Sequence, residues 1–137
     1  MEKMFTTKFI HLFFSLVLFL SFTACDTDDD LIATINVNEV NNRSGDVKGN
    51  GGTATKTWTF TNSNATAGWD MTINDASTGS FSLVLKDDAG TVVLDQTLRA
   101  DSGAKSADGT TAEGVPGEWT ATATLNNFDG TGDYSFL

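Results

Sequence analysis

The chain has 137 residues, and its 18 acidic side chains outnumber its 8 basic ones, which gives a formal net charge of −10 at pH 7. It has no basic stripe, so its composition argues against nucleic acid as a partner. Cys25 is the only cysteine, so no intrachain disulfide can form.

Residues 1–24 have the pattern of a secretory signal. Lys3 and Lys8 precede the apolar run 9–22, and the small residues Thr23-Ala24 follow it. The apolar run is shorter than the roughly 20 residues that a membrane-spanning helix needs. The pattern therefore predicts a helical signal peptide that is removed after export, with an uncleaved membrane anchor as the alternative.

The end of this segment, Phe22-Thr23-Ala24-Cys25, resembles the lipobox of bacterial lipoproteins, with Phe22 where leucine is usual. In that family the cysteine is acylated and becomes the new N-terminus. The acidic run 26–30 resembles the surface-export signal of Bacteroidota-type lipoproteins, and a solvated flexible tether is a compatible interpretation. The resemblance implies lipidation at Cys25, the membrane as a partner, and a location at the outer membrane or cell surface.

Beyond the tether of residues 25–30, residues 31–137 are predicted to form one domain. The leader contains two lysines and one glutamate, so its removal would leave the mature chain with a net charge of about −11. The leader also holds the only histidine, His11. The mature domain therefore lacks the side chains for Ser-His-Asp or Cys-His catalysis and for zinc sites built on imidazole or thiolate.

Apolar residues of the mature chain recur with a period of two, which predicts strands rather than helices. The hairpin 80–98 is the clearest unit, and Asp87-Asp88-Ala89-Gly90 forms its turn. About seven short strands predict an all-β fold, an antiparallel two-sheet sandwich, with a small β-barrel as the alternative. The other strands are expected at 31–40, 53–61, 69–73, 118–126 and 134–137, and Gly-, Asn- and Asp-rich loops at 41–52, 99–117 and 127–133.

Two segments near the C-terminal end of the sequence resemble a second group of proteins. Gly117-Glu118-Trp119-Thr120-Ala121-Thr122 and then Gly132-Asp133-Tyr134-Ser135-Phe136 resemble the last strands of bacterial jelly-roll or immunoglobulin-like accessory domains. In those domains a Gly-x-Trp strand precedes a final Gly-x-Tyr strand. The resemblance implies an extracellular β-sandwich and names no ligand.

Asn127, Asp129 and Asp133 lie in a glycine-containing stretch that resembles a calcium loop, because calcium binds several oxygens around a tight turn. The EF-hand template fails, since its glutamate would fall beyond Leu137. Calcium at a looser site is one prediction, and an ordinary turn between two strands is the alternative. No other cofactor is expected.

The three tryptophans, Trp58, Trp69 and Trp119, all lie on the apolar side of alternating strands, which predicts core packing. Trp69 follows Gly68 near a loop and is the best candidate for a partly exposed ring that stacks on a sugar. The threonine rows at 53–61 and 120–124 suit a solvated strand face better than an ice-binding array, because the chain has no repeat.

Glu113 and Glu118 flank Pro116 and are the best available carboxylate pair for glycoside hydrolysis, although solvated loop charges explain them more simply. The prediction is a non-catalytic binding or adhesion module for a glycan or an envelope protein, with contacts on the loop 99–117 and on Trp69. The alternatives are a purely structural envelope lipoprotein and, last, a carboxylate-based glycoside hydrolase.

Overall fold

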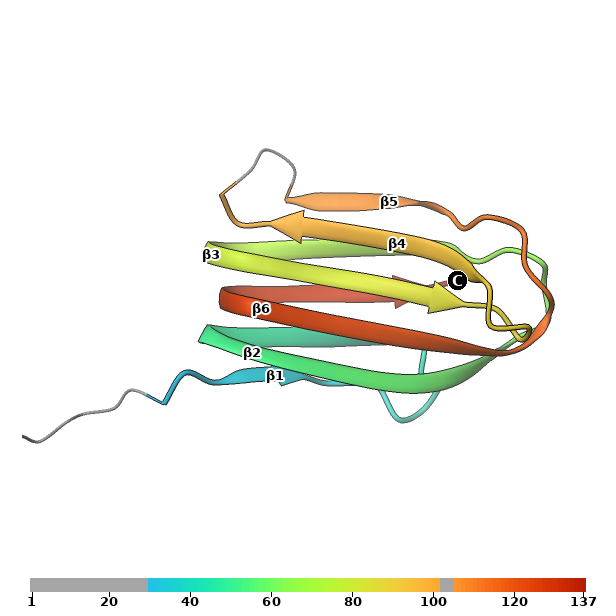
Figure 1. The fold of residues 1–137 in the computed structure, drawn as a ribbon, viewed down its shortest axis with the longest axis horizontal. Helices are drawn as coiled ribbons and strands as arrows, with labels where there is room; N and C mark the ends of the chain where they lie inside the picture. The colour runs from blue at the N-terminus through green and yellow to red at the C-terminus, as the bar shows by residue number, and fades with distance from the viewer. Residues whose placement is uncertain (1–29, 102–104) are drawn as a thin grey trace, which may run out of the picture.

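The computed structural model describes residues 30–101 and 105–137, so the predicted signal peptide and Cys25 lie outside the described residues. Over the part of the chain that it describes there is no helix, and hence none suited to crossing a membrane. Six antiparallel strands form one connected sheet (Figure 1). They are β1 (Ala33–Ile35), β2 (Ser44–Asn62), β3 (Gly68–Lys86), β4 (Val92–Arg99), β5 (Ser106–Thr110) and β6 (Gly117–Phe136).

The three long strands β2, β3 and β6 each run through both layers of the molecule. Figure 1 shows them folding over together at one end, so that a single sheet becomes a near and a far layer. We call the half with β1 and β5 the first layer and the half with β4 the second layer. β2 pairs with β6 in both layers, through residues 44–50 in the first and 54–62 in the second. The strand order is therefore the same on both sides of the bend.

The bend, called the crease here, consists of residues 50–52 of β2, 74–79 of β3 and 127–130 of β6. The pairing register shifts within β2 and β3 at these points, as expected for β-bulges, which bend and twist a strand. Gly79 has a φ of 82°, and Asn127 beside it has a φ of 45°. Glycine tolerates such positive φ angles, and asparagine does so more often than most residues.

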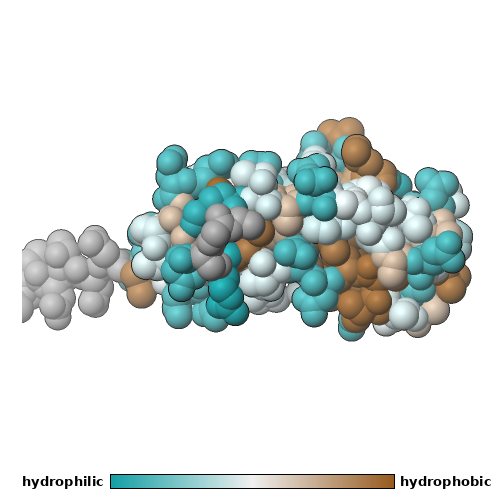
Figure 2. Space-filling model, turned by 90° about the horizontal axis from the view of Figure 1, so that it is seen from above, coloured by the Kyte–Doolittle hydropathy of each residue, from teal (hydrophilic) through white to brown (hydrophobic). Residues whose placement is uncertain are grey.

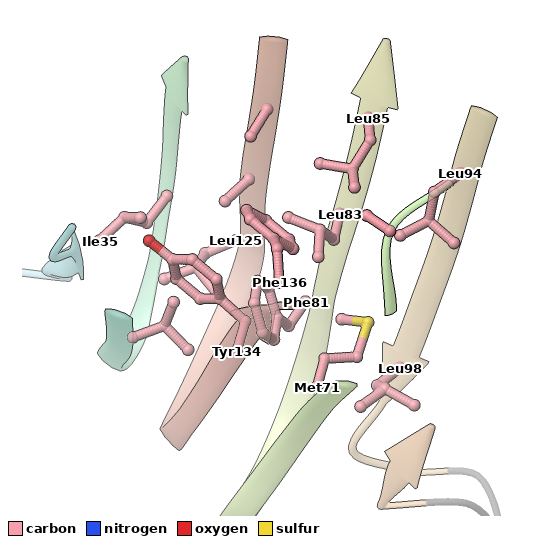
Figure 3. Close-up of a cluster of buried hydrophobic side chains, with 14 of the residues drawn as sticks. Ile35, Met71, Phe81, Leu83, Leu85, Leu94, Leu98, Leu125, Tyr134 and Phe136 are labelled. Carbon is pink, nitrogen blue, oxygen red and sulfur yellow. The ribbon is translucent and has the colours of Figure 1, made fainter. Parts of the chain in front are cut away.

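The two layers pack together through a continuous apolar core (Figure 3). Phe136 of the first layer stacks on Phe60 of the second, with ring centroids 5.0 Å apart. Tyr134 also contacts Trp58 across the layers, with the two rings tilted and their centroids 5.4 Å apart. Aromatic rings bury large areas in small cores, so these contacts between layers are a main source of stability. The core also includes Val47, Met71, Ile73, Phe81, Leu83, Leu85, Leu94, Leu98, Trp119, Leu125 and Phe128.

The predicted all-β, antiparallel, two-layer fold is confirmed, and the sheet stays open rather than closing into the barrel considered as the alternative. The hairpin 80–98 is confirmed as the β3–β4 pair. The expected alternation is also present: Phe60 and Trp119 point into the core, while Thr59 and Thr120 point outward.

The expected loops 41–52 and 127–133 are wrong, because most of the first and all of the second belong to β2 and β6. Their glycines and asparagines bend continuous strands instead of reversing the chain. The expected loop 99–117 contains β5, and the expected strand 31–40 is only the three residues of β1. The described residues therefore form six strands rather than about seven, because β3 and β6 each unite two expected strands and β5 is added.

The crease can be tested with two glycines of almost equal φ. Gly79 and Gly90 have φ angles of 82° and 80°. A Cβ at Gly79 would lie 2.2 Å from the Asn127 carbonyl oxygen, whereas one at Gly90 would meet nothing within 4 Å. We expect Gly90→Ala to cost about 1–2 kcal/mol in free energy of unfolding, and Gly79→Ala to cost a further 1–3 kcal/mol. Urea denaturation measures both, and equal losses would contradict close packing at the crease.

Candidate binding surface

The outward side of the second layer is lined with hydroxyl groups. The antiparallel register places Thr55 opposite Thr124 and Thr57 opposite Thr122. Strands lie about 4.8 Å apart and alternate residues roughly 6.7 Å apart along each strand, so the hydroxyls form regular rows. We call this surface the threonine face, and its members are Thr55, Thr57, Thr59, Thr61, Thr120, Thr122, Thr124, Ser82 and Thr97.

Many hydroxyls of the threonine face are hydrogen-bonded to each other across strands. The Oγ1 atoms of Thr57 and Thr122 are 3.0 Å apart, and Ser82 Oγ lies 2.8 Å from Thr97 Oγ1. Such pairs stabilise neighbouring strands. Each pair uses one O–H donor and leaves one donor and several lone pairs for an outside partner. The face is therefore a polar platform whose rows are explained by sheet pairing, and the register places Val84, Lys86 and Asp95 on the same side.

A pocket of about 310 Å³ lies where the threonine face meets the edge of β2 that pairs with no further strand in the second layer. We call it the rim pocket. One wall comes from the segment that joins β1 to β2, and the other comes from the ends of β2 and β6. Its lining residues are Val40, Asn41, Asn42, Arg43, Thr59, Phe60, Thr61 and Glu118.

The wall made by residues 36–43 is fixed by backbone hydrogen bonds. Asn38 N donates to Ser44 O at 2.8 Å, and Asn42 N donates to Asn38 O at 2.8 Å. Asn42 has a φ of 55°, which closes this turn. The Asn38 side-chain oxygen also accepts from Val40 N at 3.0 Å. A ligand would thus meet a wall that is already ordered, which lowers the entropic cost of binding.

Arg43 and Trp58 tie this wall to β2. The Arg43 guanidinium donates to the Thr61 carbonyl, and its Cζ lies 5.5 Å from the centre of the Phe60 ring, in cation–π geometry. The Trp58 indole N–H donates to Asn42 O at 2.9 Å. The edge of β2 is therefore covered by the same contacts that shape the pocket.

Trp69, the predicted sugar-stacking residue, is half-buried in β3. It pairs with Gly109 of β5 and Phe136 of β6 and packs against the core. Its Nε1 is buried without a hydrogen-bond partner, and a Cβ at Gly109 would contact the indole at 3.5 Å. The ring therefore lies against the neighbouring strand, away from the rim pocket. Trp119 is fully buried and Trp58 is half-buried, as core packing requires.

The predicted calcium ligands are not brought together. Asn127 lies at the crease, and Asp129 and Asp133 are four residues apart on β6, which is about 13 Å along an extended strand. Asp129 accepts a 2.6 Å hydrogen bond from Ser77 Oγ. Within residues 30–101 and 105–137 no group of three or more His, Cys, Asp or Glu side chains could hold a metal ion. Calcium binding stays a prediction.

The part of the expected ligand loop that leads into β6, residues 111–117, packs against the β3–β4 turn. The Asp87 carboxylate accepts from Val115 N at 2.8 Å and from Thr91 N at 2.7 Å. The hydrogen bond from Val115, opposed by burial, is the main cause that lowers the pKa of Asp87. Glu118 reaches the rim pocket, whereas Glu113 does not line it. A ligand role for the loop 99–117 stays a prediction.

Asn41, Asn42 and Arg43 are the lining residues that sequence reasoning missed. They lie in a segment expected to be an unpaired loop, and nothing in the sequence places them beside Thr61 and Glu118. The alternating threonines of β2 were the one available signal, because they marked the strand whose edge forms the pocket.

No protein-family model matches this chain, and no curated protein matches it. Among solved structures, TmCBM61 in complex with beta-1,4-galactotriose is similar at a TM-score of 0.42 and 7% identity, covering 78% of this chain and 69% of that one. A family 11 carbohydrate-binding module from Clostridium thermocellum, in complex with a mixed-linked tetrasaccharide, gives 0.37 and 10%, covering 77% and 81%. Arabinose-bound MgGH51 α-L-arabinofuranosidase gives 0.39 and 14%, covering 77% and 22%. At these TM-scores the similarities carry no conclusion about ligand or activity.

The lowered pKa of Asp87 predicts that the hydrogen bonds of its carboxylate to Val115 and Thr91 weaken in acid. Because its pKa is lowered in the folded state, its contribution to stability is present above the usual pKa of 3.8 and is lost as pH falls through the folded value. We expect Asp87→Asn to lower the melting temperature at pH 7 and to flatten its decline on acidification. Asp95→Asn, an exposed carboxylate on β4, is the control. Parallel melting curves for Asp87→Asn and wild type between pH 6 and pH 2 would contradict the role of Asp87.

Proposed function

We propose that this chain is a non-catalytic, glycan-binding module of the cell envelope, held to the membrane through a lipid on Cys25. The observation that supports glycan binding best is the rim pocket, which has an ordered wall, groups that donate and accept hydrogen bonds, and an opening onto the threonine face.

The chemistry of the pocket suits a sugar. Each sugar hydroxyl can donate one hydrogen bond and accept two, so it needs a site that offers both kinds of partner. Asparagine amides and threonine hydroxyls offer both, Arg43 donates, and Glu118 accepts. A volume of about 310 Å³ lies at the small end of ligand pockets. Since Thr59 and Thr61 also belong to the threonine face, further sugar units can bind along it.

The arrangement of carboxylates favours binding over hydrolysis. Glycoside hydrolases of both stereochemical types use two carboxyl groups that flank the scissile bond. The rim pocket is lined by one carboxylate, Glu118. A single acceptor can orient a sugar, whereas the usual mechanisms need a second carboxylate as nucleophile or base.

In this proposal the tether orients the pocket away from the membrane. The chain enters the domain at the crease, where Asn50 N donates to Ile32 O at 3.0 Å. The rim pocket lies near the end of β2 at Asn62, which Figure 1 places at the opposite end of the molecule. Residues 25–30 span at most about 20 Å when extended. The crease would thus face the bilayer, and the pocket would face outward.

A partner protein is the second candidate ligand, and surface apolarity favours it. Figure 2 shows apolar surface on the side of the molecule that carries β4 and β5. Val92 at the start of β4 is 50% exposed, and Val115 before β6 is 48% exposed. A contiguous patch of exposed apolar side chains often marks a site where another protein binds.

Glycan binding can be tested by calorimetry with a panel of oligosaccharides. We expect Thr61→Val, which keeps the strand-forming shape but removes one pocket hydroxyl, to weaken binding roughly two- to ten-fold. Thr34→Val, an exposed threonine of β1 outside the pocket, is the matched control and should bind as wild type does. If no oligosaccharide in the panel binds, glycan recognition is wrong for this chain.

The anchor is tested by Cys25→Ala. Removing the thiol removes the acylation site, and we expect the protein to move from the membrane to the soluble fraction. Fractionation of cells that express the full chain measures this, with Ser44→Ala as a control that leaves the thiol in place. Retention of Cys25→Ala in the membrane would contradict lipid anchoring.

A further inference from the structure

We infer that the rim pocket selects uncharged sugars over acidic ones, and that Arg43 and Glu118 set this preference. The inference rests on the proposed function, because it names the ligand class of the same pocket. Its basis is that two opposite charges, those of Arg43 and Glu118, both lie beside Thr61.

Arg43 and Glu118 approach Thr61 from different elements. The guanidinium of Arg43 donates to the carbonyl of Thr61. Glu118 is the direct partner of Thr61 in the β2–β6 register, so its Cβ lies about 5 Å from that of Thr61. The pocket thus has one cationic and one anionic side chain, and their formal charges cancel.

Such a pair fits a neutral polyol. A carboxylate accepts strongly from sugar hydroxyls, and a guanidinium donates strongly to hydroxyl or ring oxygens. Neither charge is then left without a compensating partner. A sugar carboxylate or sulfate near Thr61 would instead be repelled by Glu118.

Arg43 is also poorly placed to hold an anion by itself. Its strongest mode of anion binding uses two parallel N–H donors. Its Nη2 is already engaged by the Thr61 carbonyl, and Phe60 lies against the guanidinium. The fixed side chain keeps donors for single hydrogen bonds but cannot turn freely to grip a carboxylate or sulfate.

The charge of the whole protein acts in the same direction. The chain has a formal net charge of −10, and the predicted leader contributes none of the excess acid. A field of this sign slows the approach of polyanions, and salt screens the effect over about 8–10 Å. Acidic polysaccharides are therefore disfavoured both at a distance and within the pocket.

The test compares neutral and acidic chains of equal length on the intact domain. The probes are gluco-, galacto- and manno-hexasaccharides, and oligogalacturonate and alginate hexamers, measured by calorimetry at two salt concentrations. We expect at least one neutral hexasaccharide to bind ten-fold or more tightly than either acidic hexamer. We expect Glu118→Gln to weaken that neutral ligand roughly ten-fold and to strengthen binding of the acidic hexamers.

Asp75→Asn is the matched control, because it makes the same change in net charge on an exposed residue of the crease, outside both the pocket and the loop 99–117. It should leave neutral binding unchanged. Thermal melting of both variants verifies that each is folded. If Asp75→Asn and Glu118→Gln have equal effects, the preference is a property of net charge and the assignment to the pocket is overturned.

The remaining outcomes separate the two proposals. If acidic hexamers bind more tightly than neutral ones, the inferred selectivity is overturned while glycan binding stands. If neither class binds, the proposed function itself fails.

Discussion

The crease is the constraint on which the rest of the structure depends. Three neighbouring strands must bend at the same height, because each remains hydrogen-bonded to the same partner on both sides. Gly79 and Asn127 meet this requirement with positive φ angles, and Phe128 is fully buried there. Once the sheet is folded, Phe60 and Phe136 face each other across the interior. The core is therefore a consequence of the bend and also what holds it closed.

Because of the same bend, the two ends of the molecule contain different parts of the chain. Residues 30–35 enter at the crease, while the β1–β2, β2–β3, β3–β4 and β5–β6 connections gather at the opposite end. One of these connections, residues 36–43, lies along the otherwise open edge of β2 and forms a wall of the rim pocket. Lys56 lies on the core-facing side of β2 at that edge but is itself exposed, and its Nζ donates to Ile35 O at 3.3 Å. An inward-pointing lysine and a covering segment are both known protections of an edge strand against further pairing.

Local sequence pattern predicted the strands correctly within a single layer. The alternation of Trp119, Ala121 and Ala123 with threonines identified the buried side of β6, and the turn at Gly90 identified the β3–β4 hairpin. It failed at the crease, because an Asn-Gly or Asp-Gly stretch has the same composition in a bulge as in a turn. Whether such a stretch bends or reverses the chain depends on the pairing of both flanking segments, and that pairing is nonlocal.

The sequence by itself determined the fold class, the inward and outward sides of the central strands, and the absence of histidine and cysteine from residues 31–137. These properties follow from residue type and a period of two, which are local. Only the tertiary structure decided that six strands share one folded sheet, that Trp69 lies against β5, and that Arg43 and Glu118 meet at Thr61. Each of these depends on contacts between residues far apart in the chain, and such contacts form only when the core closes.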